Sequence, residues 1–316
     1  MKKLLLILLC LPFIGFAQTQ IPDVNFEQAL INLGYDNSLD GEVLTSNINT
    51  VDTLEVQGQN IADLTGVEAF TALTYLDCSD NQLNDIDVSG ILGLLTLKCH
   101  HNNLTQLNVS SNTSLLYFEC YENQLTSLDI SNNIFLTELW CNDNQLTSLD
   151  VQGIDMYKLV CDNNQLTTID NLGDNVSLKY LSCSNNDIVS LSLSTLTDLD
   201  WFSCSNNQLS ELDISNQSVL NYFFCWGNLS LTCINVSNVA IANTSWLVFN
   251  GQSGNIDSQH YFSLNCPSPS AIEEYNTNKY VMKIINLLGK EVKTTKNEPL
   301  FYIYNNGSVE QKIIFE

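Results

Sequence analysis

The stretch Leu73-Thr-Tyr-Leu-Asp-Cys-Ser-Asp-Asn-Gln-Leu83 decides how this chain of 316 residues folds, because variants of it recur along more than half of the sequence. Two later copies are Leu136-Thr-Glu-Leu-Trp-Cys-Asn-Asp-Asn-Gln-Leu146 and Leu199-Asp-Trp-Phe-Ser-Cys-Ser-Asn-Asn-Gln-Leu209. Self-similarity at a fixed period of about 20–50 residues is typical of repeat architectures. The cysteine of each copy follows the previous one after 20 to 22 residues, at Cys78, Cys99, Cys120, Cys141, Cys161, Cys183, Cys204 and Cys225.

Each copy alternates around its cysteine in the way that a half-buried strand does. In the first quoted copy, Leu76 and Cys78 are expected to point into the molecule, and Asp77 and Ser79 to point outward. A single turn of this length cannot bury its apolar side, but stacked turns form one continuous core. About nine turns at roughly 4.8 Å each predict a core about 40 Å long.

These copies resemble the leucine-rich repeat family, whose consensus is L-x-x-L-x-L-x-x-N-x-L, with cysteine here in place of the third leucine. An earlier copy around Leu54-Glu-Val56 and Ile61 has valine at that place. The resemblance covers residues 53–232. It implies a β-rich solenoid with a parallel sheet on its concave face, an irregular or short-helical convex side, and a cap at each end.

An asparagine follows each predicted strand, where its amide can satisfy backbone groups of the bend in turn after turn. We therefore expect these asparagines to be structural and not ligand-binding. The predicted ladder consists of Asn81, Asn102, Asn123, Asn144, Asn164, Asn186, Asn207 and Asn228.

The column of cysteines permits two interpretations, a thiolate ladder for metal or redox chemistry, or packing by a small apolar side chain. Zinc sites need clustered ligands at spacings such as C-x₂-C, and the column has none. Neighbouring cysteines would lie one strand apart with parallel side chains, which is a poor geometry for a disulfide. The pattern favours packing.

The composition excludes several classes of function. The chain has 35 acidic and 11 basic residues, no arginine, and a net charge of −24. Binding to nucleic acid or to an anionic membrane surface requires clustered basic residues, so we expect neither. Only three histidines are present, which limits histidine catalysis and zinc binding.

The first residues predict export. Met1-Lys-Lys3 and the apolar run from Leu4 to Ala17 are typical of a secretory signal peptide, here residues 1–17. Cys10 follows two leucines and not the small residues of a lipoprotein signal. The run is too short for a comfortable membrane span, and no other segment is long enough, so no span is expected after cleavage. The mature chain would then meet an oxidising compartment.

The predicted N-terminal cap is residues 18–52. Its segment Ile21–Ile31 has the pattern of a short amphipathic helix, with Phe26, Leu30 and Ile31 as the apolar stripe. The following stretch, Asp36–Gly41, is similar to a calcium loop, but its spacing differs and the closing bidentate glutamate is not convincingly placed. We therefore expect no metal and no cofactor. The cap resembles that of exported leucine-rich repeat proteins of the Bacteroidetes.

The predicted C-terminal cap is residues 233–270 and contains two cysteines, Cys233 and Cys266, that are out of register with the column. In an exported chain two such cysteines are expected to pair. The bond would close a loop of roughly 34 residues and contribute about 3–4 kcal/mol in the chain-entropy model. This region resembles the C-terminal cap of the same Bacteroidetes family.

Residues 271–316 have a different composition from the repeats. Residues 18–270 contain 29 acidic and three basic residues, whereas the tail contains six lysines and six glutamates. Its β-prone runs, with a turn at Asn306-Gly307, predict a small antiparallel unit. Through Ile284–Val292 it resembles the C-terminal sorting domain of the type IX secretion system, although it is short and lacks the usual ending. The resemblance implies that secretion machinery as a partner; a plain C-terminal β-cap is the alternative.

No pattern of catalytic residues stands out. The sequence lacks G-x-S-x-G, H-E-x-x-H, a phosphate-binding glycine loop and a dinucleotide fingerprint. A regular solenoid also lacks the deep pocket that catalysis requires. We expect a protein that is not an enzyme.

The outward positions of the predicted strands carry many rings. Aromatic side chains beside carboxylates suit protein recognition and also sugar stacking. The alternative is that the rings only shield neighbouring strands. The candidate ligand-binding residues are Tyr75, Tyr117, Glu119, Tyr121, Trp140, Tyr180, Trp201, Tyr222, Phe224 and Trp226.

The sequence predicts a secreted or cell-surface binding protein that mediates protein–protein interaction or adhesion through its concave face. Glycan capture and a purely structural surface scaffold are the alternatives. A protein partner of an acidic face would be basic and its binding salt-sensitive. Sugar binding would depend on Trp140 and Trp201 and be almost independent of salt.

Overall fold

The computed structural model describes residues 17–247, 254–267, 281–285, 290–292, 299–304 and 309–313. The signal-peptide prediction for residues 1–17 and the predicted turn at Asn306-Gly307 therefore fall almost entirely outside the described residues. The described chain forms two compact units, one up to Cys266 and one from Pro267 onward. In the described part, no helix is long and apolar enough to cross a membrane.

The N-terminal cap of the first unit combines a strand pair with two helices. Strand β1 (Gln18–Gln20) pairs antiparallel with β2 (Glu42–Leu44), and helices α1 (Val24–Leu33) and α2 (Thr45–Ile48) flank β2 in the sequence. Helix α1 begins where Asp23 accepts the backbone N–H groups of Asn25 and Phe26, and ends at Gly34 with φ +83°. Phe26 and Leu30 are fully buried, as the apolar stripe predicted, whereas Ile31, the third predicted member, is only partly buried.

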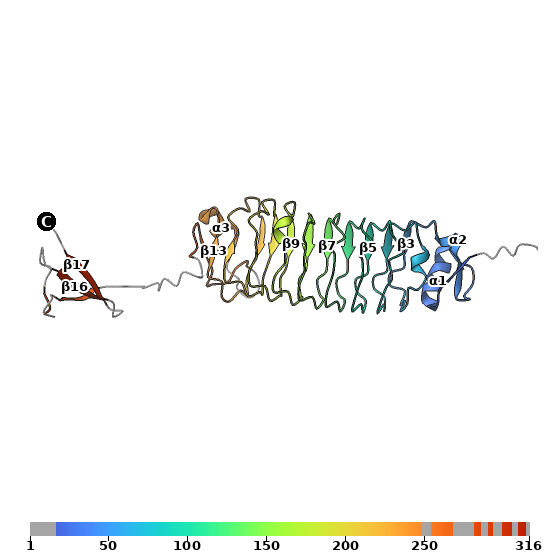
Figure 1. Cartoon of the computed structure of the whole chain (residues 1–316), viewed down its shortest axis with the longest axis horizontal. Helices are drawn as coiled ribbons and strands as arrows, with labels where there is room; N and C mark the ends of the chain where they lie inside the picture. Colours follow the sequence, from blue (N-terminus) through green and yellow to red (C-terminus); the bar gives the residue numbers. More distant parts are fainter. Residues whose placement is uncertain are drawn as a thin grey trace, which may run out of the picture. The chain divides into compact units, whose positions relative to one another are not determined.

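A parallel sheet of nine short strands runs through the first unit, as Figure 1 shows between the helices of its two ends. Each strand pairs in register with the next, and each central residue is buried because the strands alternate inward and outward positions. The predicted parallel solenoid is confirmed. The strands are β3 (Thr53–Glu55), β4 (Tyr75–Asp77), β5 (Thr96–Lys98), β6 (Tyr117–Glu119), β7 (Glu138–Trp140), β8 (Lys158–Val160), β9 (Tyr180–Ser182), β10 (Trp201–Ser203) and β12 (Tyr222–Phe224).

The core is built from the central strand residues and the column of cysteines behind them. All eight column cysteines are free and buried. Burial raises the pKa of these thiols, that of Cys141 to about 12. The Cys78 Sγ lies 3.3 Å from the carbonyl oxygen of Lys98 in the next turn and donates to it. A buried, protonated thiol of this kind behaves as a small apolar side chain with a weak donor.

The eight asparagines of the predicted ladder make one repeated set of hydrogen bonds. In the turn of Asn102, the amide nitrogen donates to the carbonyl oxygens of Cys78 (3.0 Å) and Cys99 (3.1 Å), and Oδ1 accepts the N–H of Leu83 at 2.9 Å. The residue before the asparagine has a left-handed backbone, as at His101 with φ +52°. That bend turns the backbone polar groups inward, where the asparagine satisfies them.

A second ladder of buried amides supports the opposite side of the turns, and the sequence analysis missed it. Asn112 donates to the carbonyl oxygens of Val88 and Ile91, both at 2.9 Å. Asn133, 21 residues later, donates to the carbonyl oxygen of Asn112 at 2.8 Å. This side is irregular, with the short 3₁₀ helices η1 (Val67–Ala69) and η2 (Leu172–Asp174).

The C-terminal end of the first unit is closed by a separate sheet and a helix. Strands β11 (Leu212–Asp213), β13 (Cys233–Asn235) and β14 (Tyr261–Ser263) pair in parallel, and α3 (Val239–Ser245) precedes β14. Cys233 and Cys266, which the sequence analysis paired, are joined by a disulfide. The bond ties the last residue of the unit to strand β13.

The second unit is a small antiparallel sheet, as the tail pattern predicted. Strand β16 (Pro299–Tyr304) lies between β15 (Val281–Ile285) and β17 (Val309–Ile313). Both pairings are antiparallel. Among the described residues of this sheet, Leu300 on β16 is fully buried.

Candidate interaction surface

The outward side chains of β3 to β12 form a continuous surface that we call the sheet face. It consists of the first and third residue of each strand and the residue that follows the column cysteine. Parallel pairing in register places equivalent residues of successive turns side by side, roughly 4.8 Å apart. Side chains that lie 20 to 22 residues apart in the sequence therefore touch.

Stacked rings occupy the sheet face over its last three strands. Trp201 of β10 lies between Tyr180 of β9 and Tyr222 of β12, with ring centroids 5.2 and 4.9 Å apart. Phe224 contacts Trp201 from the third position of β12, at 5.6 Å. The indole Nε1 of Trp201 is buried and has no hydrogen-bond partner. These four residues form the aromatic ladder.

A lysine extends the aromatic ladder toward the middle of the sheet. The ammonium of Lys158 lies 4.6 Å from the ring centroid of Trp140 on one side and 4.5 Å from that of Tyr180 on the other. Cation–π contacts of this kind contribute about 0.5–2 kcal/mol each. Lys158 is not among the residues predicted from the sequence, although its place three residues before Cys161 is the place of Tyr180 and Trp201 in their own turns.

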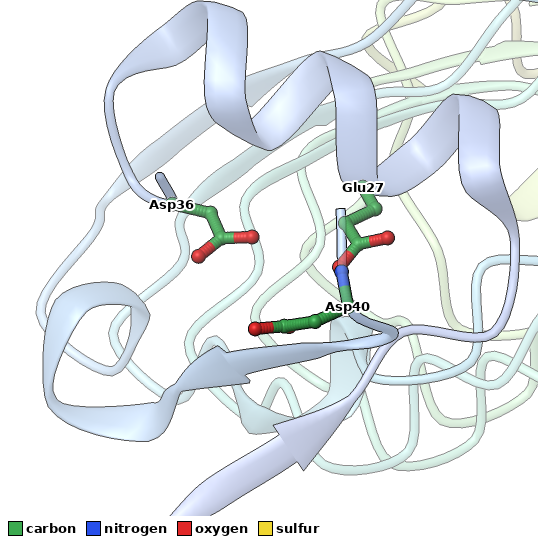
Figure 2. A group of neighbouring side chains, drawn as sticks. All are labelled: Glu27, Asp36 and Asp40. Atoms are coloured by element: carbon green, nitrogen blue, oxygen red, sulfur yellow. The ribbon is translucent and has the colours of Figure 1, made fainter. Parts of the chain in front are cut away.

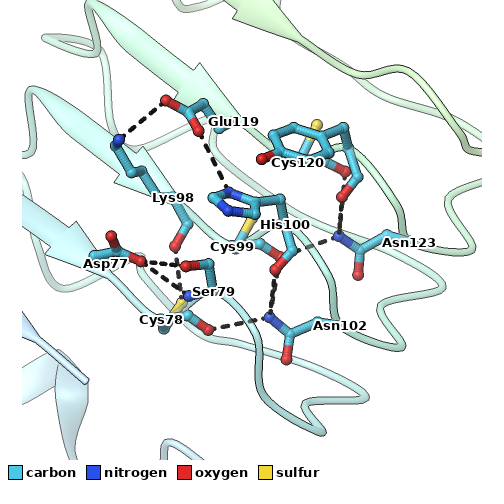
Figure 3. A network of polar contacts seen from close by, with 11 residues as sticks. Asp77, Cys78, Ser79, Lys98, Cys99, His100, Asn102, Glu119, Cys120 and Asn123 are labelled. Carbon is cyan, nitrogen blue, oxygen red and sulfur yellow. Dashed lines mark hydrogen bonds and ion pairs between the residues drawn. The ribbon is translucent and has the colours of Figure 1, made fainter. Parts of the chain in front are cut away.

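Charged side chains occupy the sheet face over β4 to β6 (Figure 3). Glu119 lies 3.2 Å from the ammonium of Lys98 and 3.4 Å from Nδ1 of His100, the latter without the alignment of a hydrogen bond. His100 stacks on Tyr121 with ring centroids 4.3 Å apart.

The candidate residues predicted from the sequence all lie on the sheet face, but with unequal exposure. Tyr117 and Tyr222 are 43% and 52% exposed. Tyr75 and Tyr117 do not meet, because Thr96 of β5 lies between them. Ser79, expected to point outward, is only 3% exposed. The remaining candidates are partly buried: Tyr75, Glu119, Tyr121, Trp140, Tyr180, Trp201, Phe224 and Trp226.

Two buried histidines make stability depend on pH. Burial lowers the pKa of His100 and of His260 below the usual 6.5, and nearby Glu119 and Asp257 only partly oppose this effect. Between each lowered pKa and about 6.5, the unfolded chain binds more protons than the folded chain. The free energy of unfolding should therefore keep its full value above about pH 6.5. It should decrease as the pH falls below 6.5, because protonation then favours the unfolded chain.

Urea unfolding at pH 7.5, 6.5 and 5.5 measures this loss of stability, and the variant His100→Gln/His260→Gln should show a flatter profile. Asp162 changes the free energy of unfolding in the opposite direction. Burial raises the pKa of its carboxyl group, so its protonation at lower pH favours the folded state. A native profile as flat as that of the double variant would contradict the prediction.

The comparisons with known proteins give structural neighbours only. No family model matches the chain, and no curated protein matches it. The functional domain of InlJ from Listeria monocytogenes, which includes a cysteine ladder, superposes with a TM-score of 0.55 at 28% identity over 70% of this chain. This chain spans 57% of the length of that structure.

Two further structures share the fold at lower identity. Internalin C2 of L. monocytogenes matches at 20% identity and a TM-score of 0.51, over 70% of this chain and 98% of its own. The ectodomain of the Arabidopsis thaliana receptor kinase GASSHO1/SCHENGEN3, solved in complex with CASPARIAN STRIP INTEGRITY FACTOR 2, matches at 22% and 0.52, over 61% of this chain and 28% of its own. The chain thus has a leucine-rich repeat fold with cysteine-containing repeats of about 21 residues.

Proposed function

We propose that this protein is an exported binding module that recognises a protein partner, or mediates adhesion, through its sheet face. The aromatic ladder carries the proposal. Rigid rings such as Trp201 and Tyr222 supply contact area at little cost in conformational entropy, and aromatic residues dominate the binding energy of protein interfaces. Among the structural neighbours, the plant receptor ectodomain was solved in complex with CASPARIAN STRIP INTEGRITY FACTOR 2.

The charges of the sheet face favour a basic partner. Glu55, Asp77, Glu119 and Glu138 lie on the strands of the face, and Lys98 is already paired with Glu119. The chain carries 24 more negative than positive charges, which would steer a cationic partner toward it. Such steering weakens as salt screens the charges.

Export is part of the same proposal. The disulfide between Cys233 and Cys266 fits an oxidising compartment. The signal-like residues 1–17 and the sorting-like residues 271–316 are the features that would direct the chain to the cell surface or the medium, the latter through the type IX secretion machinery.

A display library of random 12-residue peptides, selected on the full chain, tests the proposal. We expect binders enriched in lysine and arginine whose affinity falls about tenfold between 0.05 and 0.5 M NaCl. Tyr222→Ala should weaken them about tenfold or more, because it removes an exposed ring from the ladder. Tyr261→Ala is the matched control, since that ring is 50% exposed on β14, outside the sheet face.

Recognition through the sheet face would be contradicted if Tyr222→Ala and Tyr261→Ala weakened the binders equally. It would also be contradicted if neither variant weakened them. A glycan array with the same variants covers the second candidate function, for which the stacked rings are the favouring observation. If sugar binding is lost in Trp201→Ala and does not change with salt, the ligand of the sheet face is a carbohydrate and not a protein.

A further inference from the structure

Three carboxylates converge in the N-terminal cap, outside the sheet face. Glu27 comes from α1, and Asp36 and Asp40 come from the loop between α1 and β2 (Figure 2). One oxygen of each lies within 4.8 Å of the other two. Glu27 is 3% exposed, and its Oε1 accepts the backbone N–H groups of Asp40 (2.7 Å) and Gly41 (2.6 Å).

The cluster contains a buried oxygen that nothing in the described structure satisfies. Oδ2 of Asp36 is inaccessible to solvent and has no hydrogen-bond partner. Figure 2 shows this carboxylate pointing toward Glu27 and Asp40. Buried polar atoms of native proteins almost always have a donor, a water or an ion beside them, and a buried carboxylate without one is costly. Asp40 is exposed and accepts hydrogen bonds from Ser38 Oγ and the Glu42 N–H, so the unsatisfied group is Oδ2 of Asp36. A cation between Asp36, Asp40 and the buried Glu27 would satisfy it.

No side chain in this part of the chain can be that partner. Between Gln18 and Leu97 the sequence contains no lysine, arginine or histidine. Glu27 is nonetheless almost fully buried and Asp36 is partly buried, while Asp40 is exposed. Like charges this close together repel, most strongly at the buried end of the cluster. Backbone N–H groups satisfy one oxygen of Glu27 and supply no net charge.

The order of residues in the loop matches the first half of a calcium-binding loop. Asp36, Ser38 and Asp40 stand at the first, third and fifth places of a calcium-binding loop, and Gly41 stands at the sixth, where the chain must turn sharply. Gly41 has φ +83°, a conformation that favours glycine. The acid that such a loop normally supplies at its end comes here from Glu27, one helix earlier in the chain.

We propose that Glu27, Asp36 and Asp40 bind one calcium ion that joins α1 to the loop before β2. All donors are oxygens, and calcium accepts the irregular geometry of a loop and a helix, whereas magnesium requires a near-ideal octahedron. The expectation of no metal rested on a spacing of Asp36–Gly41 judged to differ from a calcium loop and on the lack of a closing glutamate after it. The first six places do match such a loop, and the closing acid precedes it, at Glu27. The site lies in the cap and does not depend on the proposed partner of the sheet face.

Calcium titration of the full chain, stripped with EDTA, tests the proposal. Calorimetry with CaCl₂ should give one site of about 10⁻⁴–10⁻³ M, the range of modules that work outside cells, with weaker binding of MgCl₂. The thermal midpoint should rise by about 3–8 °C at 10 mM CaCl₂. Terbium bound at the site should show luminescence sensitised by the neighbouring Tyr35.

Asp36→Asn separates a metal site from a merely acidic cluster. The variant should bind calcium about tenfold more weakly or worse and lose the calcium-dependent rise in midpoint. Without calcium its midpoint should equal or exceed that of the native chain, since one repulsive charge is gone. Asp198→Asn, a substitution of an exposed acid elsewhere, is the matched control and should change neither quantity.

The proposal is overturned if the native chain shows no heat and no rise in midpoint up to 10 mM CaCl₂. In that case, a higher midpoint of Asp36→Asn in EDTA would show only that the three acids repel one another without binding a cation. Should Asp36→Asn not fold, the calcium titration of the native chain and of Asp40→Asn decides the question.

Discussion

Replacing Asn102 by alanine should lower the free energy of unfolding by about 3–5 kcal/mol. The Asn102 side chain is only 8% exposed, and Oδ1 is the partner of the Leu83 N–H. Its amide nitrogen also donates hydrogen bonds to the carbonyl oxygens of Cys78, Cys99 and His100, as Figure 3 shows in part. Alanine would leave these groups buried without the amide, at a cost of about 1–3 kcal/mol for each one that stays unsatisfied.

The next residue is the matched control. Asn103 is exposed, and its backbone N–H, which bonds to the carbonyl oxygen of Leu83, is retained in alanine. Asn103→Ala should therefore change the stability by no more than about 0.5 kcal/mol. Urea unfolding followed by circular dichroism measures both variants. Equal effects of the two substitutions would show that the buried amide is not what holds one turn to the next.

Breaking the disulfide by Cys233→Ser/Cys266→Ser should lower the stability of the C-terminal cap by about 3–4 kcal/mol. The bond closes a sequence separation of 33 residues, between strand β13 and the end of the first unit. Its loss lets that whole loop gain conformational freedom when the cap opens. Because turns of a solenoid contact only their neighbours, hydrogen exchange should increase at β13, β14 and α3 far more than at β3 to β6.

Reducing agent provides the control for this prediction. Dithiothreitol should lower the midpoint of the native chain to that of the double variant and leave the variant unchanged. The eight column cysteines are free and buried, so they should react with a thiol reagent only after denaturation. A midpoint of the variant that still responds to dithiothreitol would reveal a disulfide among the column cysteines, contrary to the structure.

The parallel solenoid and its inward positions follow from the sequence alone. Burial in a strand depends on alternation, and the repeat states the same alternation eight times around Cys78 to Cys225. The disulfide could also be predicted from the sequence, because Cys233 and Cys266 are the two cysteines after residues 1–17 that do not follow the repeat period. The second amide ladder could have been recognised as well, because Asn112 and Asn133 lie one repeat period apart in the sequence. It was not predicted because these asparagines do not adjoin a predicted strand.

What only the tertiary structure decided is which side chains of different segments meet, and how. The position of Lys158 in its turn could be read from the period, but its place between Trp140 and Tyr180 depends on side-chain conformations across three turns. The carboxylates of Glu27 and Asp36 converge only because α1 packs back onto the loop that follows it. Periodic burial is a local property that each repeat carries in its own residues, whereas a constellation of polar groups is set by the docking of segments that no single stretch of sequence contains.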